Sequence, residues 1–161
     1  MPVTVTAYVG LGANLTDPQG TVQRALLALA TLPTTRLTAQ SSLFRSAPID
    51  ADGDDYVNAV AQLHTALPAE ALLSALQQIE SEFGRERPYH HAPRTLDLDL
   101  LLYGDQQIHS ASLTVPHPRM TQRAFTLIPL LQLDPLITIP GLGAAHLHVS
   151  GVAGQSIQKI Q

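Results

Sequence analysis

Two aspartates, Asp97 and Asp99, have the residue type and the spacing that suit a divalent cation. They lie in the segment TLDLDLLLY, where a strand period of two places both carboxylates on one face and Leu98 on the other. Two neighbouring carboxylates repel each other unless a cation or an arginine neutralises them. The spacing therefore predicts a metal site, and the alternative is a solvated strand face of alternating polarity.

Arginines are concentrated around this strand. Five of them fall between positions 85 and 123: Arg85, Arg87, Arg94, Arg119 and Arg123. Guanidinium groups bind phosphate oxygens bidentately, so arginines beside paired carboxylates fit a site for a metal-bound polyphosphate. The basic loop 84–94 is interpreted as a lid over phosphate; its alternative is a surface loop that its arginines keep solvated.

Three further side chains could contact a ligand. His117 is held between two prolines, which restricts its backbone, although a lone histidine also has common structural roles. Tyr56 and Asn58 share one strand face, so an aromatic ring lies beside an amide that donates and accepts. This pair could hold a flat heterocycle, or it could be an ordinary exposed strand start. The segment GLGANL lacks the lysine and third glycine of nucleotide-binding loops, so no Walker or dinucleotide site is expected.

The composition restricts the class of protein. The chain has 161 residues, 45% of them apolar and 14% charged, which predicts one compact domain over 1–161. It has no cysteine, which excludes disulfides, thiolate nucleophiles and cysteine-ligated metals. A net charge of −4 with 4% aromatic residues argues against nucleic-acid binding. No membrane-spanning run or signal peptide is recognised, so a cytoplasmic protein is expected.

The elements that must position these residues alternate between strand and helix. Hydrophobic periodicity and turn residues predict, in order, a strand at 3–11, a helix at 18–32, strands at 35–47 and 56–65, a helix from 68 to 84 and a strand at 95–103. The order βαββαβ predicts an α+β, ferredoxin-like sandwich in which two helices cover one face of an antiparallel sheet. Beyond residue 104 we expect a C-terminal extension with a helix at 119–131 and a glycine-rich tail.

Several segments resemble one known family. In this order and at these separations, SSLFRSAP, DYVNAV, QQIESEFGRER, APRTLDLDLLLYG and LTVPHPRMTQRAF are similar to 6-hydroxymethyl-7,8-dihydropterin pyrophosphokinases of folate biosynthesis. The resemblance covers about positions 5 to 140, and APRTLDLDLL is its most specific part. It implies a ferredoxin-like fold, ATP as co-substrate, two Mg²⁺ ions, and transfer of pyrophosphate from ATP to the pterin alcohol with release of AMP.

The resemblance also implies roles for individual residues. The two metal ions fall on Asp97 and Asp99, and Arg85 and Arg94 are the loop arginines nearest the transfer chemistry, so these four are the implied catalytic residues. The implied pterin-binding residues are Ser46, Ile49, Tyr56, Asn58 and Phe125. The implied ATP-binding residues are Gln77, Glu80, Arg87, Arg94, Leu100, Thr114, His117 and Arg123. The expected partners are these small molecules alone, with neither nucleic acid nor membrane, and the expected state is a monomer.

One rival interpretation is a noncatalytic ferredoxin-like module that binds RNA or a small molecule. An RNA binder needs exposed aromatic residues on central strands and a basic surface, which this acidic, aromatic-poor chain lacks. Release of AMP from ATP in the presence of the pterin alcohol would distinguish the two. No residue of the sequence is an obvious general base, because carboxylates committed to a metal accept protons poorly.

Overall fold

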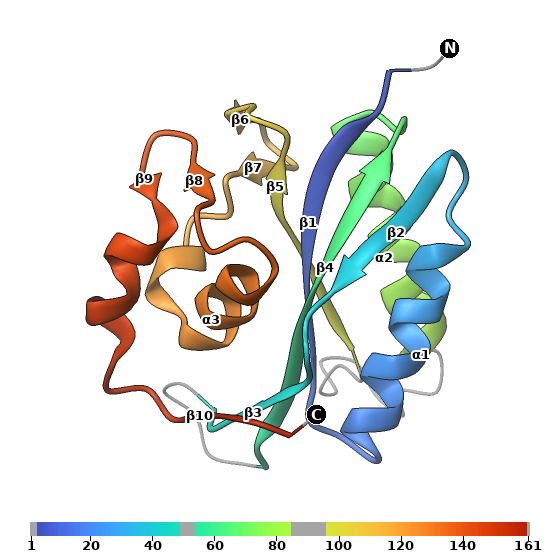
Figure 1. Cartoon of the computed structure of the whole chain (residues 1–161). Helices are drawn as coiled ribbons and strands as arrows, with labels where there is room; N and C mark the ends of the chain where they lie inside the picture. The colour runs from blue at the N-terminus through green and yellow to red at the C-terminus, as the bar shows by residue number, and fades with distance from the viewer. Residues whose placement is uncertain (1–2, 49–53, 85–95, 161) are drawn as a thin grey trace.

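The computed structural model describes residues 3–48, 54–84 and 96–160. Its centre is an antiparallel sheet with strand order β10-β3-β4-β1-β5, and β2 also pairs with β4. The strands of this sheet are β1 (Val5–Ala13), β2 (Thr35–Gln40), β3 (Phe44–Ser46), β4 (Tyr56–Thr65), β5 (Asp97–Tyr103) and β10 (Ile157–Lys159). Figure 1 shows this sheet between two layers of helix.

One face of the sheet is covered by two helices, α1 (Pro18–Ala30) and α2 (Ala69–Phe83). Asp17 caps α1 by accepting a hydrogen bond from Gly20 N at 3.2 Å, and Pro18 occupies a first-turn position that needs no N–H donor. Each helix turns one apolar stripe to the sheet: Thr21, Val22, Ala25, Leu26 and Leu29 from α1, and Ala69, Leu72, Leu76 and Ile79 from α2. The βαββαβ order and the ferredoxin-like arrangement are therefore confirmed.

The predicted continuous strand at 35–47 is wrong, because the structure divides it into β2 and β3. Both pieces pair with β4, but Ser41 interrupts the ladder: its N–H donates to Val60 O at 2.8 Å, and its Oγ accepts from Val60 N at 2.9 Å. The next residue, Ser42, is bound by Gln132, whose Oε1 accepts from Ser42 N at 2.7 Å. A side-chain partner thus replaces the regular backbone pairing.

The C-terminal extension covers the second face of the sheet. After the small hairpin of β6 (Ile108–His109) and β7 (Thr114–Val115), the predicted helix at 119–131 proves to be two helices, the 3-10 helix η1 (Met120–Gln122) and α3 (Ala124–Leu133). They meet at Arg123, whose backbone is extended, with φ −129° and ψ 117°. From these elements Met120, Leu127 and Leu130 pack onto the sheet in a second core.

The predicted glycine-rich tail is an ordered part of the fold. It forms β8 (Thr138–Ile139), β9 (Gly143–Ala144) and the 3-10 helix η2 (Ala145–Val152), and ends in β10, which pairs with β3 at the sheet edge. The three residues of β10, Ile157–Lys159, therefore add a strand to the sheet beyond the last one predicted from the sequence, at 95–103.

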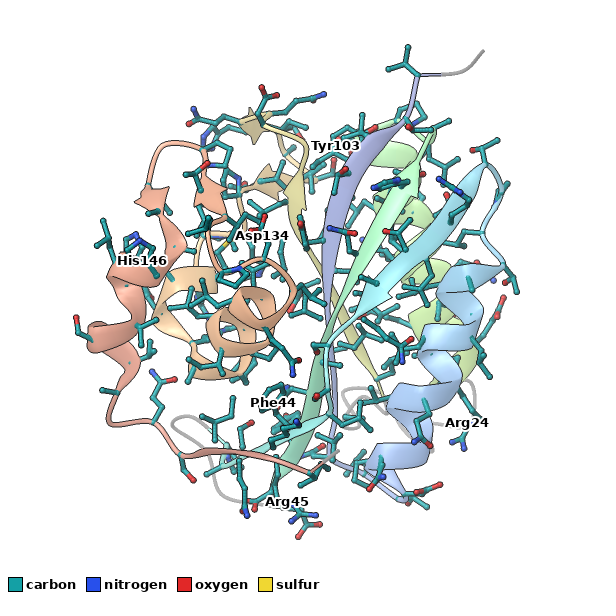
Figure 2. All side chains as sticks on the ribbon, viewed as in Figure 1. Arg24, Phe44, Arg45, Tyr103, Asp134 and His146 are labelled. Atoms are coloured by element: carbon teal, nitrogen blue, oxygen red, sulfur yellow. The ribbon has the colours of Figure 1, made fainter. Side chains whose placement is uncertain are left out.

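A bulge in β5 allows this strand to contribute side chains to both cores. The pairing shifts between Val9↔Leu100 and Tyr8↔Leu102, so Leu101 is the extra residue. Leu98, Leu100 and Tyr103 belong to the helix-side core, whereas Leu101 and Leu102 belong to the second core. Figure 2 shows Tyr103 at the end of the sheet remote from Phe44 and Arg45 of β3. There its hydroxyl donates to Leu67 O, and burial raises its pKa.

Asp97 and Asp99 precede the bulge and lie half-buried on the second face, with Leu98 buried on the other, which confirms the predicted alternation. Both aspartates line a part of this face that α3 leaves open.

Among the described helices, none is long and apolar enough to cross a membrane.

Candidate active site

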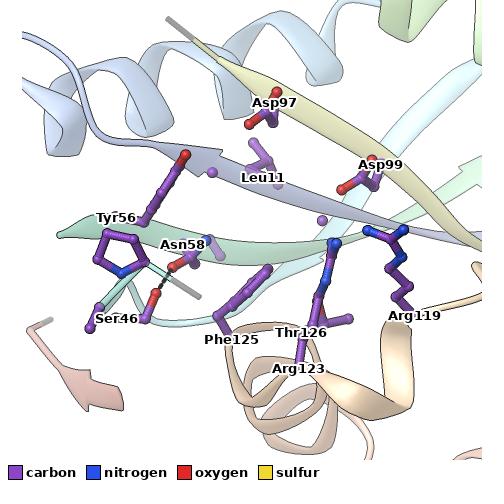
Figure 3. Close-up of a pocket in the computed structure, with 15 residues that line it drawn as sticks. Leu11, Ser46, Tyr56, Asn58, Asp97, Asp99, Arg119, Arg123, Phe125 and Thr126 are labelled. Atoms are coloured by element: carbon purple, nitrogen blue, oxygen red, sulfur yellow. Dashed lines mark hydrogen bonds between the residues drawn. The ribbon is translucent and has the colours of Figure 1, made fainter. Parts of the chain in front are cut away.

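A pocket of about 380 Å³ opens on the second face, where the cover of α3 ends. Segments far apart in the sequence form its walls (Figure 3): β1, the end of β3, the start of β4, the start of β5, and η1 with α3. The residues that line it are Gly10, Leu11, Gly12, Ser46, Ala47, Pro48, Tyr56, Asn58, Ala59, Asp97, Asp99, Arg119, Arg123, Phe125 and Thr126.

The acidic wall is formed by Asp97 and Asp99 beside two glycines of β1. The register places Gly12 opposite Asp97 and Gly10 opposite Asp99. On its other side Gly12 lies opposite Asn58 of β4, and a Cβ at Gly12 would approach Asn58 Nδ2 to 3.0 Å. A side chain at this position would thus push the amide aside, so glycine leaves the floor of the pocket open.

The basic wall faces these carboxylates. Arg119 and Arg123 extend from η1 and the start of α3 toward Asp99 (Figure 3), and the Arg123 guanidinium carbon lies 5.4 Å from the centre of the Phe125 ring. Within the described ranges, neither arginine forms an ion pair with Asp99. Opposite charges that face each other without contact leave room for a ligand that carries both cations and anionic oxygens.

His117 borders the acidic wall and is rigidly held. Its backbone N–H donates to Leu101 O at 2.9 Å, and its Nδ1 accepts from Arg119 N at 3.1 Å. Because Nδ1 is an acceptor, the neutral ring carries its proton on Nε2, which lies 3.8 Å from Asp99 Oδ1. Burial lowers the pKa of His117, Asp99 opposes this effect, and Arg123 and Arg119 add to it. The imidazole is therefore a neutral donor at pH 7.

The other end of the pocket combines aromatic rings with a buried amide. Ser46 Oγ donates to Asn58 Oδ1 at 2.6 Å, and both side chains are buried. Asn58 Nδ2 then remains on the Gly12 side, toward the pocket. Figure 3 shows the rings of Tyr56 and Phe125 on either side of this amide. Apolar walls around a few fixed polar groups suit a flat, hydrogen-bonding heterocycle.

The remaining site residues that were predicted from the sequence lie near the outer edge of β5 or outside the described ranges. On this edge Glu80 Oε2 accepts from Leu98 N at 2.8 Å. Gln77 is exposed on α2, Thr114 lies on β7, and Leu100 has its side chain in the helix-side core. Ile49, Arg85, Arg87 and Arg94 belong to segments that the structure does not describe.

The structure adds pocket residues to which sequence reasoning gave no role. Gly10 and Gly12 lie in GLGANL, which was set aside because it does not match a nucleotide-binding loop, whereas its glycines serve to keep a strand surface clear. Arg119 belongs to the counted arginine cluster but received no role of its own. Thr126 follows Phe125 on α3, and no local pattern singled it out.

Protein side chains on the acidic wall supply only some of the oxygen ligands that a magnesium ion needs. Among the described residues, no group of three or more histidine, cysteine, aspartate or glutamate side chains is arranged to hold a metal ion. Mg²⁺ is usually held by one or two carboxylates, with water and substrate phosphates supplying its other oxygens. A carboxylate pair facing arginines therefore fits Mg²⁺ that arrives with a polyphosphate.

Comparison with known proteins gives consistent results. Residues 8–135 match the family model described as 7,8-dihydro-6-hydroxymethylpterin-pyrophosphokinase (HPPK). Two similar proteins, from Pseudomonas aeruginosa and Haemophilus influenzae, are both named 2-amino-4-hydroxy-6-hydroxymethyldihydropteridine pyrophosphokinase. The first is 49% identical over 134 residues, which are 83% of either chain. The second is 43% identical over 137 residues, which are 84% of this chain and 86% of the relative.

Solved structures share the fold. A crystal structure of an HPPK-DHPS protein in complex with substrates superposes with a TM-score of 0.75 at 12% identity, over 93% of this chain and 43% of that one. A Plasmodium falciparum HPPK-DHPS structure gives a TM-score of 0.74 at 12% identity, over 91% and 44%. The chain thus spans less than half the length of these solved chains, and at this identity they support the ferredoxin-like fold alone.

Proposed function

The chain belongs to the 7,8-dihydro-6-hydroxymethylpterin-pyrophosphokinase family, and from this membership we propose how its pocket carries out the family's reaction. It is an ATP-dependent pyrophosphokinase, a diphosphotransferase of folate biosynthesis. Pyrophosphate passes from ATP to 6-hydroxymethyl-7,8-dihydropterin, and the products are AMP and the pterin diphosphate.

Asp97 and Asp99 are the proposed ligands of two Mg²⁺ ions. Both carboxylates lie on one wall of the pocket, and Asp99 keeps 43% of its side chain exposed, so both solvent and substrate oxygens have access. When bound, such ions neutralise phosphate oxygens and favour in-line displacement at phosphorus. Neighbouring carboxylates on one strand face repel each other in general, and a bound cation would reduce such repulsion.

Pterin is proposed to occupy the aromatic end of the pocket. Tyr56 and Phe125 would stack on its two faces, while Asn58 Nδ2 donates to an acceptor at the ring edge. The bond from Ser46 to Asn58 Oδ1 supports this role, since it fixes which end of the amide faces the pocket. Ile49 is proposed as a further contact from the segment outside the described ranges.

ATP is proposed to lie along the outer edge of β5. Leu98 N–H points outward to Glu80, and strand alternation turns the backbone groups of Leu100 to the same edge. Because its side chain is buried, Leu100 could bind a nucleotide only through its backbone. The remaining proposed ATP contacts are Gln77, Glu80, Arg87, Arg94, Thr114, His117 and Arg123.

This placement puts the phosphates between the nucleotide edge and the pterin end. The pterin hydroxymethyl oxygen attacks the β-phosphorus of ATP and loses its proton to solvent, the bond from that phosphorus to the α,β-bridging oxygen breaks, and AMP departs. Arg123 and the Nε2–H of His117 are proposed to stabilise charge on the phosphate oxygens, and Arg85 and Arg94, which lie outside the described ranges, are proposed to add further positive charge. Positioning and electrostatics account for the rate in this scheme, and no protein group is assigned as the general base.

The remaining features of this proposal concern the whole chain. Residues 1–161 are proposed as one pyrophosphokinase domain that works as a monomer in the cytoplasm, with ATP and the pterin alcohol as its only partners. The single-domain part of this proposal is supported by the central sheet, which contains both β1 and β10, the first and the last described strands.

The observation that carries this proposal is the carboxylate pair in the middle of the pocket, between the aromatic end and the β5 edge. Asp97→Asn and Asp99→Asn should each lower AMP release at least about 100-fold, because a transition-state charge contact is lost. Since both side chains are half-buried at a surface pocket, thermal melting should shift by no more than about 4 °C.

Asp105→Asn is the matched control, because Asp105 is exposed in a turn of the same region and does not line the pocket. AMP is measured with ATP, Mg²⁺ and the pterin alcohol present. Turnover close to that of the parent protein in either the Asp97 or the Asp99 variant would contradict the metal assignment.

A further inference from the structure

Gln155, in the connection between η2 and β10, binds the backbone on both sides of Arg123. Its Oε1 accepts a hydrogen bond from Ala124 N at 2.8 Å, and its Nε2 donates to Gln122 O at 2.8 Å. Gln155 itself does not line the pocket, whereas Arg123 does. One side-chain amide from the end of the chain thus spans the junction between η1 and α3.

The start of α3 has no side-chain cap of its own. The first N–H groups of a helix lack intrahelical partners, and the N-cap residue of α3 is Arg123, whose side chain makes no capping bond. Ala124 is buried at 2% exposure, so an unpaired N–H there would be costly. Gln155 supplies the missing acceptor from 31 residues further along the chain.

The two hydrogen bonds of Gln155, together called the clamp, lie directly beside two pocket side chains. Arg123 and Phe125 leave the chain within one residue of Ala124, and the extended backbone of Arg123 lies between the two peptide groups that Gln155 holds. The guanidinium carbon of Arg123 also lies 5.4 Å from the centre of the Phe125 ring. A cation–π contact at a partly exposed site is weak, so it does not by itself fix the direction of Arg123.

We propose that Gln155 is a positioning residue for ATP and pterin binding, acting through Arg123 and Phe125. By holding both peptide groups, it preorganises the guanidinium toward Asp99 and the ring toward Asn58 before substrate arrives. The proposal rests on the function proposed above, since it assigns Arg123 to ATP and Phe125 to the pterin. Small displacements of a positioned contact reduce catalysis strongly, which makes the clamp a determinant of kcat/KM.

The test uses graded substitutions of one side chain. Gln155→Met keeps the length but removes both hydrogen bonds, and Gln155→Glu keeps the acceptor for Ala124 N while losing the donor to Gln122 O. Gln158→Met is the matched control, because Gln158 is an exposed residue of the neighbouring β10. We expect Gln155→Met to lower kcat/KM for ATP about tenfold, Gln155→Glu to lower it less, and Gln158→Met to stay within about twofold.

A double-mutant cycle separates positioning from general destabilisation. In an Arg123→Ala background, Gln155→Met should lower kcat/KM for ATP by no more than about twofold, because Arg123, the side chain through which Gln155 is proposed to act on ATP, is already absent. A tenfold loss that persists in that background would overturn the role through Arg123, and so would Gln155→Met with the kinetics of the parent protein. If Gln155→Met does not fold, the same cycle with Gln155→Glu decides the question.

Hydrogen exchange tests the clamp without turnover. The amide of Ala124 should exchange faster in Gln155→Met than in Gln158→Met, with other amides of α3 unchanged. Equal exchange in the two variants would overturn the clamp, whether or not the parent protein is active. A parent protein that releases no AMP would instead refute the proposed function, so the two failures can be told apart.

Discussion

Arg119 lies on the basic wall of the pocket, and its position predicts a role in phosphate binding. Its guanidinium is exposed and extends toward Asp99 beside Arg123. Arg119→Ala should lower kcat/KM for ATP about 10-fold, the effect of one charge-assisted contact, and Arg119→Lys should restore part of it. Arg24→Ala is the control, since Arg24 pairs with Asp17 on the surface at 3.7 Å. Equal kinetics of the Arg119 and Arg24 variants would exclude this role.

His117 should make the stability of the metal-free protein dependent on pH. Burial lowers its pKa in the folded state, so below about pH 6.5 the unfolded chain binds a proton that the folded chain does not. The free energy of unfolding therefore contains a His117 contribution that is fully present above pH 6.5 and is lost as the pH falls toward the lowered pKa.

His117→Gln removes this contribution, so the stability of the parent relative to the variant should fall as the pH is lowered through this window. Urea unfolding at several pH values, in a chelating buffer, measures the difference. A difference that stays constant from pH 7.5 to about pH 5 would show that His117 titrates equally in both states.

At the scale of elements, β1 serves as the floor of the pocket, and its two glycines differ in their surroundings. A Cβ at Gly12 would come within 3.0 Å of Asn58 Nδ2, whereas a Cβ at Gly10 would meet Leu101 Cδ1 at an ordinary 3.5 Å. Gly12→Ala should therefore displace the amide and raise KM for the pterin about 5- to 50-fold, with a smaller effect on ATP. Gly10→Ala is the matched control. Pterin titration that does not distinguish the two variants would remove Asn58 from the pterin site.

Those features that depend on local periodicity could be predicted from the sequence. Strand alternation suffices to place Asp97 and Asp99 on one face of β5. It likewise places Tyr56 and Asn58 on one face of β4, and all four residues line the pocket. The break at Ser41 could not be predicted, because its neighbour Ser42 is bound by Gln132, 90 residues away in sequence. Propensity describes neighbours along the chain, and it carries no signal of such a partner.

The same limit applies to the site. Sequence patterns and family resemblance indicated seven of the fifteen residues that line the pocket, but they gave no role to Arg119, Gly12 or Gln155. Gly12 and Gln155 adjoin distant segments of the chain: Gly12 lies beside Asn58, and Gln155 binds the peptide groups on both sides of Arg123. The roles of Arg85, Arg87 and Arg94 remain predictions, because these residues lie outside the described ranges.

For the molecule as a whole, the two edges of the sheet favour a monomer. Along β5, Leu98 N donates to Glu80 and Leu101 O accepts from His117 N, so part of this edge is already paired within the chain. The opposite edge consists of β10, which has three residues, and of β2, whose pairing with β4 is interrupted by a bulge between Leu37 and Ala39. Short, bulged or occupied edges pair poorly with a second copy. Sedimentation equilibrium at micromolar concentration should give the mass of one chain, and a dimer would contradict this expectation.

Gln155 and β10 follow the pocket residues in sequence, and this bears on the order in which the protein becomes active during translation. A ribosome makes the N-terminal residues first, so Asp97, Asp99 and Arg123 are synthesised before the clamp that holds Arg123. Until β10 is made, the outer edge of β3 also has no partner strand, which leaves the nascent chain open to pairing with its neighbours. On the proposed role of Gln155, binding competence is gained only after residues 155–159 have been made, and a polypeptide that stops before them carries the carboxylates and arginines without the geometry that makes them an enzyme.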